Sequence, residues 1–436
     1  MLHSHETLDR PGGVSRVHLL TPLRHRDFRV LWTGMAVSLV GDGIFLVAIA
    51  WEAYALWNAP AALAIVGIGM TIPTVLFLLP GGVVSDRLDR RTVMLCADAL
   101  RGVSVAILAA LAFASALRLW ELVALVGVYG VGTAFFTPAF DAVVPDLLPA
   151  DDLAAANALD QFVRPIAFRL AGPAIGGGLV AASAGIAFTV DALSFAFAGI
   201  AVLMMRRPDR PWHQAPAPVV TAMVEGLRFV RHRVWLWGTL LSAAVAYLVF
   251  LGPTEVLLPY VVKNDLHGSA GVLGLVFAAG GLGAILSAVV LGQRRHPERD
   301  VTVMYATWTV ATLAVAGYGI ATAAWQLMVA CFLFNGLETA GTIVWATMKQ
   351  RHVPASMLGR VSSLDWLISI GLLPLSFALT APIAGLFGAR ATLIGAGLVG
   401  GAITLGALFL PGMRDIEGNP GDALARSTGG SLVPTR

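Results

Sequence analysis

Long apolar stretches separated by short polar segments run through almost the whole chain. Each stretch reaches about 20 residues, the length that a helix needs to cross the roughly 30 Å hydrocarbon core of a bilayer. The pattern therefore predicts an all-α integral membrane protein with twelve transmembrane helices. Their bounds, good to a few residues, are 30–57, 61–83, 92–116, 119–143, 153–182, 185–205, 234–262, 269–292, 301–322, 325–348, 357–386 and 388–411.

The middle of the chain interrupts this pattern and divides the spans into two groups of six. Residues 206–218 are rich in proline, which is incompatible with a regular helix. Apolar residues then recur at helical spacing from Val219 to Val230 with charged residues between them, which predicts an amphipathic helix on the cytoplasmic face. The predicted parts are a cytoplasmic N-terminal segment (1–28), two six-helix bundles (29–205 and 234–413), a cytoplasmic linker (206–233) and a disordered cytoplasmic tail (414–436).

Composition and charge fix the class and the orientation. The chain is 57% hydrophobic and only 13% charged, and its mean hydropathy is +0.78, which excludes a soluble globular protein. Of its 29 Lys and Arg residues, 23 fall in the termini and in the loops on one side of the predicted spans. Because such residues favour the cytoplasmic side, both termini are predicted inside the cell, in the cytoplasmic membrane. This distribution follows topology rather than forming one basic patch, so nucleic acid is not an expected partner.

The loop between the second and third spans carries a dense group of charges. Gly82 is expected to let neighbouring helices approach closely, while Asp86 could pair with arginines across the bundle in only one of two conformations. The segment resembles the signature loop of the major facilitator superfamily, although Asp89 replaces the second glycine of that pattern. The matching residues, a candidate conformational switch, are Gly82, Asp86, Arg87, Arg90 and Arg91.

The resemblance extends along most of the chain. Segments 22–32, 38–42, 138–148, 156–159 and 353–361 are similar to the branch of the superfamily that holds macrolide exporters and the enterobactin exporter. It implies the major facilitator fold, in which two six-helix bundles enclose a central cavity lined by helices 1, 4, 7 and 10. It does not imply a particular substrate, because this branch exports chemically unrelated compounds.

The fifth predicted span contains a glycine-rich stretch that resembles the core of the antiporter motif of this superfamily. Its residues are Gly172, Pro173, Gly176 and Gly177. A smooth glycine face lets a helix pack closely and seal a leak path, and a proline lets it kink. Export is one interpretation of this stretch, and a plain helix-packing face is the other.

Charged residues inside the spans are the main functional candidates, because a charge near the centre of a membrane helix costs roughly 2.5 to 3.5 kcal/mol. Asp98 and Arg101 are three residues apart, and Asp160 and Arg164 are four residues apart, so each pair can form an ion pair on one helix face. A structural role is therefore favoured over proton coupling for these pairs. Depth along each helix places Glu255 at the outer interface. The candidates for proton coupling are Asp42, Glu338 and Asp365. For Asp42, a structural hydrogen-bonded acid is the alternative.

The remaining chemistry narrows the function further. All nine histidines lie in termini or loops, so any proton step within the membrane has to use carboxylates. No phosphate-binding loop and no metal-ligand spacing is found, no cofactor is expected, and the two cysteines, Cys96 and Cys331, are interpreted as buried thiols. Aromatic residues that could face a lipophilic substrate are Phe45, Phe136, Phe140 and Trp366.

Together these features predict a transporter rather than an enzyme. The expected activity is proton-coupled efflux of small lipophilic or amphiphilic compounds by alternating access, carried out by a monomer in the lipid bilayer. A siderophore or metabolite exporter, or an importer, is the alternative within transport. A membrane sensor or assembly partner that transports nothing is the alternative from another class.

Overall fold

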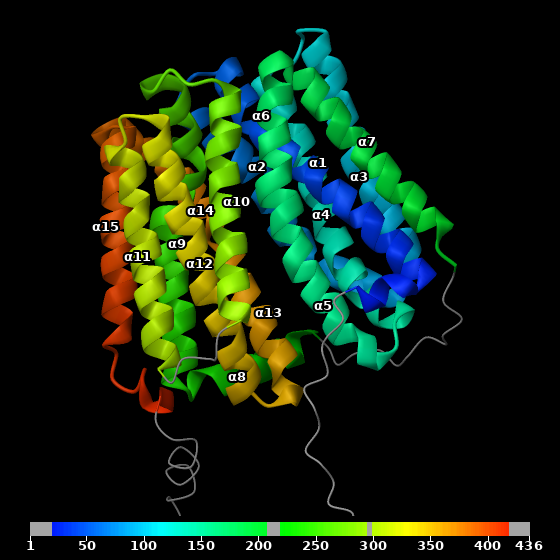
Figure 1. Ribbon diagram of the computed structural model, residues 1–436, viewed down its shortest axis with the longest axis vertical. Helices are drawn as coiled ribbons and strands as arrows, with labels where there is room; N and C mark the ends of the chain where they lie inside the picture. Colours follow the sequence, from blue (N-terminus) through cyan, green and yellow to red (C-terminus); the bar gives the residue numbers. More distant parts are fainter. Residues whose placement is uncertain (1–19, 207–218, 294–298, 418–436) are drawn as a thin grey trace, which may run out of the picture.

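The computed structural model describes residues 20–206, 219–293 and 299–417 and is built from helices (Figure 1). Twelve helical segments of the described chain are long and apolar enough to cross a membrane. Each of them overlaps one of the twelve spans predicted from the hydrophobic pattern, and their ends differ by a few residues. The predicted all-α membrane fold is therefore confirmed.

The first half of the chain contains six spans. A short η1 (Thr21–Arg24) leads into the first of them, and the fifth is made of three consecutive pieces. The elements are α1 (Arg26–Leu56), α2 (Pro60–Arg87), α3 (Arg90–Phe113), α4 (Leu119–Leu147), α5 (Ala150–Arg164), η2 (Pro165–Ala171), α6 (Gly172–Ala182) and α7 (Ala184–Met204).

The second half begins with a helix too short to span a membrane, α8 (Val219–Arg231), and then contains six further spans. These are α9 (Val234–Tyr260) with η3 (Val261–Asp265), α10 (Ala270–Gly292), α11 (Asp300–Ile320), α12 (Ala324–His352), α13 (Ala355–Gly371) with α14 (Leu373–Phe387), and α15 (Ala389–Leu408). A single turn, η4 (Asp415–Glu417), follows the last span.

The two halves stand side by side, α1 to α7 in one and α9 to α15 in the other (Figure 1). Helix α8 crosses beneath the second half at one end of the molecule, which we call the linker end; the opposite end is the far end. Gly226 of α8 lies against Arg360 and Leu364 of α13, and Arg360 forms an ion pair with Glu225. The linker helix is thereby fixed to the lower part of the eleventh span.

Two spans are broken where the sequence suggested continuous helices. The fifth changes to a π-helix at Pro165, because proline has no N–H to donate to the helical ladder and its ring crowds the preceding turn. The eleventh is interrupted at Leu372, with a proline in the first turn of the helix that follows. Both breaks lie at comparable places in the two halves, and the first one positions residues of the central cavity.

The charged loop between α2 and α3 connects three helices of the first half. Arg90 donates to the Ala142 carbonyl of α4 at 2.8 Å, and Arg91 donates to the Val202 carbonyl of α7 at 2.9 Å. Asp89 has φ −59°, so the turn does not use the left-handed conformation that the missing glycine would supply. The motif arginines thus tie the linker ends of α3, α4 and α7 together.

Two members of this motif need separate comment. The expected close approach at Gly82 is not found, because a Cβ there would meet nothing within 4 Å; the neighbouring Gly81 faces α4 instead, with Ala134 in contact. The side chain of Asp86 lies outside the described residues. The role of Asp86 as a switch stays a prediction.

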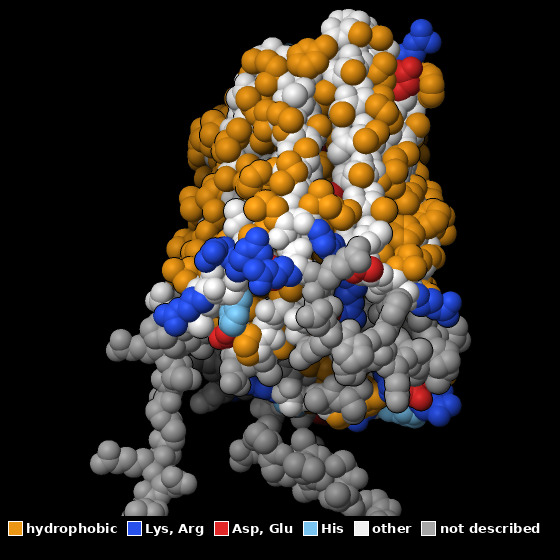
Figure 2. Space-filling view, turned by 90° about the vertical axis from the view of Figure 1, so that its right-hand side faces the viewer, with side chains coloured by type: hydrophobic (Ala, Val, Ile, Leu, Met, Phe, Trp, Pro, Cys, Tyr) orange, Lys and Arg blue, Asp and Glu red, His pale blue; other side chains and the backbone are white. Residues whose placement is uncertain are grey.

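The outer surface agrees with a membrane setting. Hydrophobic side chains cover most of the height of the molecule, whereas Lys and Arg gather towards the linker end (Figure 2). The start of the predicted disordered tail is ordered: Glu417 in η4 accepts a hydrogen bond from the Thr302 hydroxyl at 2.9 Å, which holds this turn against α11.

Candidate functional site: a central cavity between the two halves

Contacts between the two halves concentrate at the far end. Tyr54 donates to the Val256 carbonyl at 2.5 Å, and Asn58 donates to the Asn264 side chain at 2.6 Å. The Lys263 ammonium lies 5.2 Å from the centre of the Trp51 ring. All of these residues come from the far ends of α1 and of α9 with η3. These contacts close the molecule at the far end.

The predicted antiporter-like stretch forms part of this closure. A Cβ on Gly177 would lie 2.9 Å from the Ala270 carbonyl oxygen of α10, and a Cβ on Gly176 would lie 2.9 Å from the Ile44 Cα of α1. Only glycine permits such backbone contact. Gly176 therefore packs within its own half, while Gly177 faces the other half.

We expect Gly177→Leu to prevent the far end from closing, because the added side chain meets the backbone of α10 rather than a movable side chain. Gly178 is the matched control, since a Cβ there meets nothing within 4 Å. Proton leakage and substrate flux in reconstituted vesicles measure the effect. Gly177→Leu should be leaky or inactive and Gly178→Leu normal; equal behaviour of the two variants would contradict a seal at Gly177.

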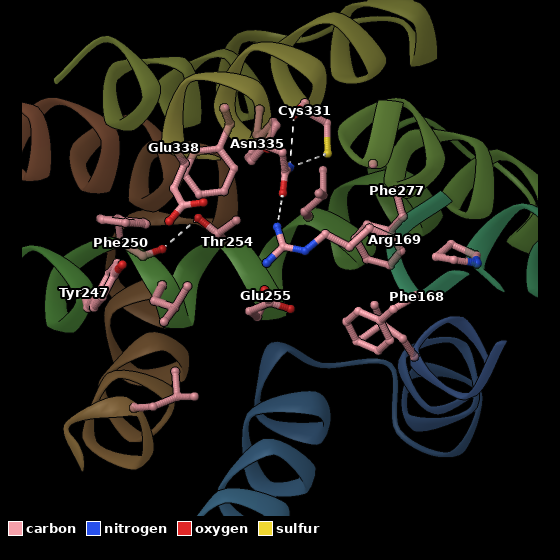
Figure 3. Close-up of a pocket in the computed structure, with 18 of the residues that line it drawn as sticks. Phe168, Arg169, Tyr247, Phe250, Thr254, Glu255, Phe277, Cys331, Asn335 and Glu338 are labelled. Atoms are coloured by element: carbon pink, nitrogen blue, oxygen red, sulfur yellow. Dashed lines mark hydrogen bonds between the residues drawn. The ribbon is translucent and has the colours of Figure 1, made fainter. Parts of the chain in front are cut away.

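A cavity of about 540 Å³ lies between the halves. Its wall is largely aromatic and its polar groups are few, as in pockets that take drug-sized ligands (Figure 3). The aromatic residues that line it are Phe168, Tyr247, Phe250, Phe277, Tyr318, Phe334 and Trp366. They come from both halves, so a bound molecule would contact each half at once.

Arg169 is the central polar group of this cavity. The π-helix of the fifth span places it there, and its guanidinium donates to the Asn335 side-chain oxygen of α12 at 2.8 Å (Figure 3). Glu255 and Glu338 line the same cavity. One guanidinium and two carboxyl groups thus line a cavity whose other polar side chains are uncharged. The sequence placed Arg169 within a span, but only the break at Pro165 shows that it points into the cavity.

Three of the predicted residues fall where expected, and two do not. Glu338 and Trp366 line the cavity, and the Glu338 carboxylate accepts from the Thr342 hydroxyl at 3.1 Å. Glu255, which helix depth placed at the outer interface, lines the cavity instead, and its helix, α9, continues past it into η3. Cys331 is a buried thiol of the cavity wall, whereas Cys96 is exposed and not buried as expected.

The other three predicted aromatics belong to the packed interior of the first half. Phe45 stacks on the Tyr129 ring with centroids 4.7 Å apart, and Phe140 stacks on Phe136 at 5.8 Å. In the described residues none of Phe45, Phe136 and Phe140 is part of the cavity wall. Helical position alone could not separate a residue facing the cavity from one facing the next helix of its own bundle.

Asp42 and Asp365 also lie away from the cavity wall, in different surroundings. Asp42 accepts a hydrogen bond from the Tyr129 hydroxyl at 2.6 Å, within the first half. Asp365 accepts from the Lys349 ammonium at 2.5 Å and from the Trp345 ring nitrogen at 2.8 Å, within the second half. The helical pairs predicted from spacing are formed, Arg101 to Asp98 at 2.5 Å and Arg164 to Asp160 at 3.2 Å.

Two bundles of six spans around a cavity that is closed at one end define a membrane transporter of the major facilitator type. Residues 17–425 match the family described as transmembrane secretion effector, and the chain belongs to this family of the major facilitator superfamily. It is 24% identical over 367 residues to macrolide efflux protein A of Streptococcus pyogenes, covering 83% of this chain and 90% of that protein. It is 28% identical over 414 residues to the multidrug efflux pump Tap of Mycobacterium tuberculosis, covering 90% and 95%.

Solved structures agree on the fold. A bacterial homologue of the human lysosomal transporter Spinster, in an inward-facing and unoccupied conformation, has a TM-score of 0.65 at 15% identity and covers 92% of this chain and 99% of its own. A bacterial homologue of the iron transporter ferroportin, in an inward-facing state, has a TM-score of 0.64 at 15% identity and covers 91% and 100%.

Proposed function

We propose that the protein is a proton-coupled exporter of small lipophilic or amphiphilic compounds that works by alternating access. The observation that carries this proposal is the central cavity, which combines an aromatic wall with one guanidinium and two carboxyl groups and is built from both halves. Such a wall accepts apolar groups of varied shape, while its charged groups orient a polar end. Efflux relatives support the direction of transport.

The basic residues near the linker end support a cytoplasmic position for that end, and therefore for both chain termini, in the inner membrane. In this orientation the closed far end faces outward, and the cavity is set to load from the cytoplasm. Rocking of the two halves, which act as a single monomeric unit, then exposes the cavity to the outside.

Proton coupling is assigned to carboxylates inside the membrane, with Asp42 as the leading acid and Glu338 and Asp365 as the others. Tyr129 donates a hydrogen bond to Asp42 outside the cavity, since neither residue is part of the cavity wall. Asp86 in the loop after α2 is assigned the role of biasing the conformational equilibrium.

Transport into inverted membrane vesicles tests this function. With an imposed pH gradient, acidic inside, vesicles that contain the protein should accumulate a fluorescent amphiphilic dye, and collapsing the gradient with a protonophore should release it. Vesicles that carry no expressed protein are the control. Dye movement that ignores the gradient would contradict proton coupling, and no movement of any dye or metabolite in a broad panel would favour a sensor.

We expect Asp86→Asn to slow turnover while dye affinity and membrane insertion stay near normal, because the residue is assigned to the conformational step and not to dye binding. Initial rates over a range of dye concentrations separate the two quantities. Asp89→Asn, one turn away in the same loop, is the control for a general charge effect. An unchanged maximal rate in Asp86→Asn would remove the switch role.

A further inference from the structure

Three aspartates and one arginine meet inside the first half, away from the central cavity. Asp42 comes from α1, Asp98 and Arg101 from α3, and Asp191 from α7. Asp98 is 2% exposed, Arg101 4% and Asp191 0%, while Asp42 is half-buried. None of the four lines the cavity between the halves. We call them the buried charge cluster.

The hydrogen bonds inside this cluster are incomplete. Arg101 donates to one oxygen of Asp98, and the second oxygen of that carboxyl group is buried without a partner, as is the Arg101 Nε. Asp191 also has one buried oxygen, Oδ2, without a partner. If all three carboxyl groups were ionised, one guanidinium would face three negative charges, leaving two unbalanced. An unbalanced buried charge costs several kcal/mol, so this charge state is strongly disfavoured.

Asp191 is the member that most clearly requires a proton. Its Oδ1 accepts from the Ser194 hydroxyl at 3.3 Å and packs directly against α1, where a Cβ on Gly41 would lie 2.5 Å from it. No cation of the described residues is paired with it. A protonated carboxyl group carries no charge and avoids most of the desolvation cost that an isolated carboxylate would incur.

The groups that face Asp191 come from each helix packed against α7. Asp191 interacts electrostatically with Asp42 of α1, Arg101 of α3 and Tyr129 of α4. Helix α6 also touches α7 but contains no titratable residue. Asp42 also interacts electrostatically with Arg101 and with Arg164 of α5. Of the cations in the described part of the chain, Arg101 alone interacts electrostatically with both Asp42 and Asp191, and in this conformation it is bonded to Asp98.

We propose that the coupling proton of the transport cycle resides in the buried charge cluster, on Asp191 in the conformation that is closed at the far end. This proposal rests on the proposed function. When the proton leaves to water, the Arg101 guanidinium turns from Asp98 towards Asp42 and Asp191 and balances the new charge. Because α1, α3 and α7 all contribute, the exchange of partners changes how these helices pack.

Aromatic rings enclose the Arg101 guanidinium, and none of the cluster residues lines the substrate cavity. The Arg101 guanidinium lies between the rings of Phe136 and Phe195, 4.3 and 4.5 Å from their centres. Phe45 covers the Tyr129 ring. Proton and substrate therefore bind in different compartments and communicate through helix movement, so a neutral substrate and a cationic one are driven by the same proton.

Distances between spin labels test the site without any substrate. Leu88→Cys and His352→Cys place one label on each half near the linker end, in full-length protein whose Cys96 and Cys331 are replaced by serine. Lowering the pH should lengthen the label distance, because protonation favours the conformation that is closed at the far end. Asp191→Asn, which is neutral at every pH, should hold the long distance throughout.

Two further variants test in which direction the pH midpoint of the distance change moves and whether a cavity acid affects it. Asp98→Asn frees Arg101 to stabilise ionised Asp42 and Asp191, so the midpoint of the distance change should move to lower pH by about one unit, a tenfold change in proton affinity. Glu338→Gln removes the competing acid, which lines the cavity, and tests that alternative directly: the midpoint should stay in place if the cluster holds the proton.

The possible results distinguish a failure of the proposed proton site from a failure of the proposed export function. A pH response in Asp191→Asn equal to that of the unmodified chain, a shift to higher pH in Asp98→Asn, or loss of the response in Glu338→Gln would each overturn the proposed site. If Asp191→Asn does not fold, the sign of the Asp98→Asn shift decides. Failure of dye export with these pH responses intact would instead overturn the proposed export function.

Discussion

Asp42→Asn is expected to abolish uphill export driven by a pH gradient. Asp42 is the acid of the buried charge cluster that receives the Tyr129 hydroxyl at 2.6 Å, and an amide oxygen preserves that hydrogen bond while removing the charge that Arg101 has to balance. Without the Asp42 carboxylate, ionised Asp191 alone competes with Asp98 for Arg101, so proton release from Asp191 no longer changes the partner of Arg101. The cavity is untouched, so dye should still exchange down its own concentration gradient.

Two assays on the same vesicles separate these effects. Accumulation against a dye gradient should fall to the level of vesicles without the protein, and counterflow of dye with no pH gradient should continue. Glu338→Gln is the comparison, since this carboxyl group lines the cavity and should change dye affinity more than coupling. Normal uphill export by Asp42→Asn would return this residue to a structural role, and a stronger loss of coupling in Glu338→Gln would move the proton site to the cavity.

The fold could be predicted from the sequence almost completely, because membrane helices are determined by local properties. A stretch of about 20 apolar residues must be helical to satisfy its backbone hydrogen bonds in lipid, whatever its neighbours are. The two breaks were harder to foresee. Pro165 was visible in the sequence, but many membrane helices accommodate proline, as α9 does at Pro253 without a change of helix type.

The site was predicted less well, because it depends on rotation of each helix about its axis. Asp98 and Arg101 could be paired from their spacing, since both lie on one helix. Asp191 lies within the span predicted at 185–205, but nothing in the sequence indicated that it approaches Asp42 of another helix. Arg169 was missed as a cavity residue because the π-helix that turns it inward alters the usual helical periodicity.

Asp365 and Lys349 give the second large expected effect, which concerns stability rather than transport. The Lys349 ammonium is 11% exposed, and its partner carboxylate, at 2.5 Å, is 19% exposed. Asp365→Asn leaves this lysine charged, poorly hydrated and without its counter-ion, next to the Trp345 ring. Removing one partner of a buried ion pair costs roughly 3 to 5 kcal/mol, so we expect a clearly lower unfolding temperature in detergent.

The paired variant shows whether this carboxylate is a structural partner or a coupling acid. Lys349→Met together with Asp365→Asn removes both charges and keeps an extended apolar side chain, so the unfolding temperature should recover most of the loss, as in a double-mutant cycle with strong coupling. If Asp365 serves mainly to hold Lys349, this double variant should also export uphill at a near-normal rate. Recovery of stability without recovery of uphill export would instead assign a proton-coupling role to Asp365, because the helices would then be intact while the titratable group is gone.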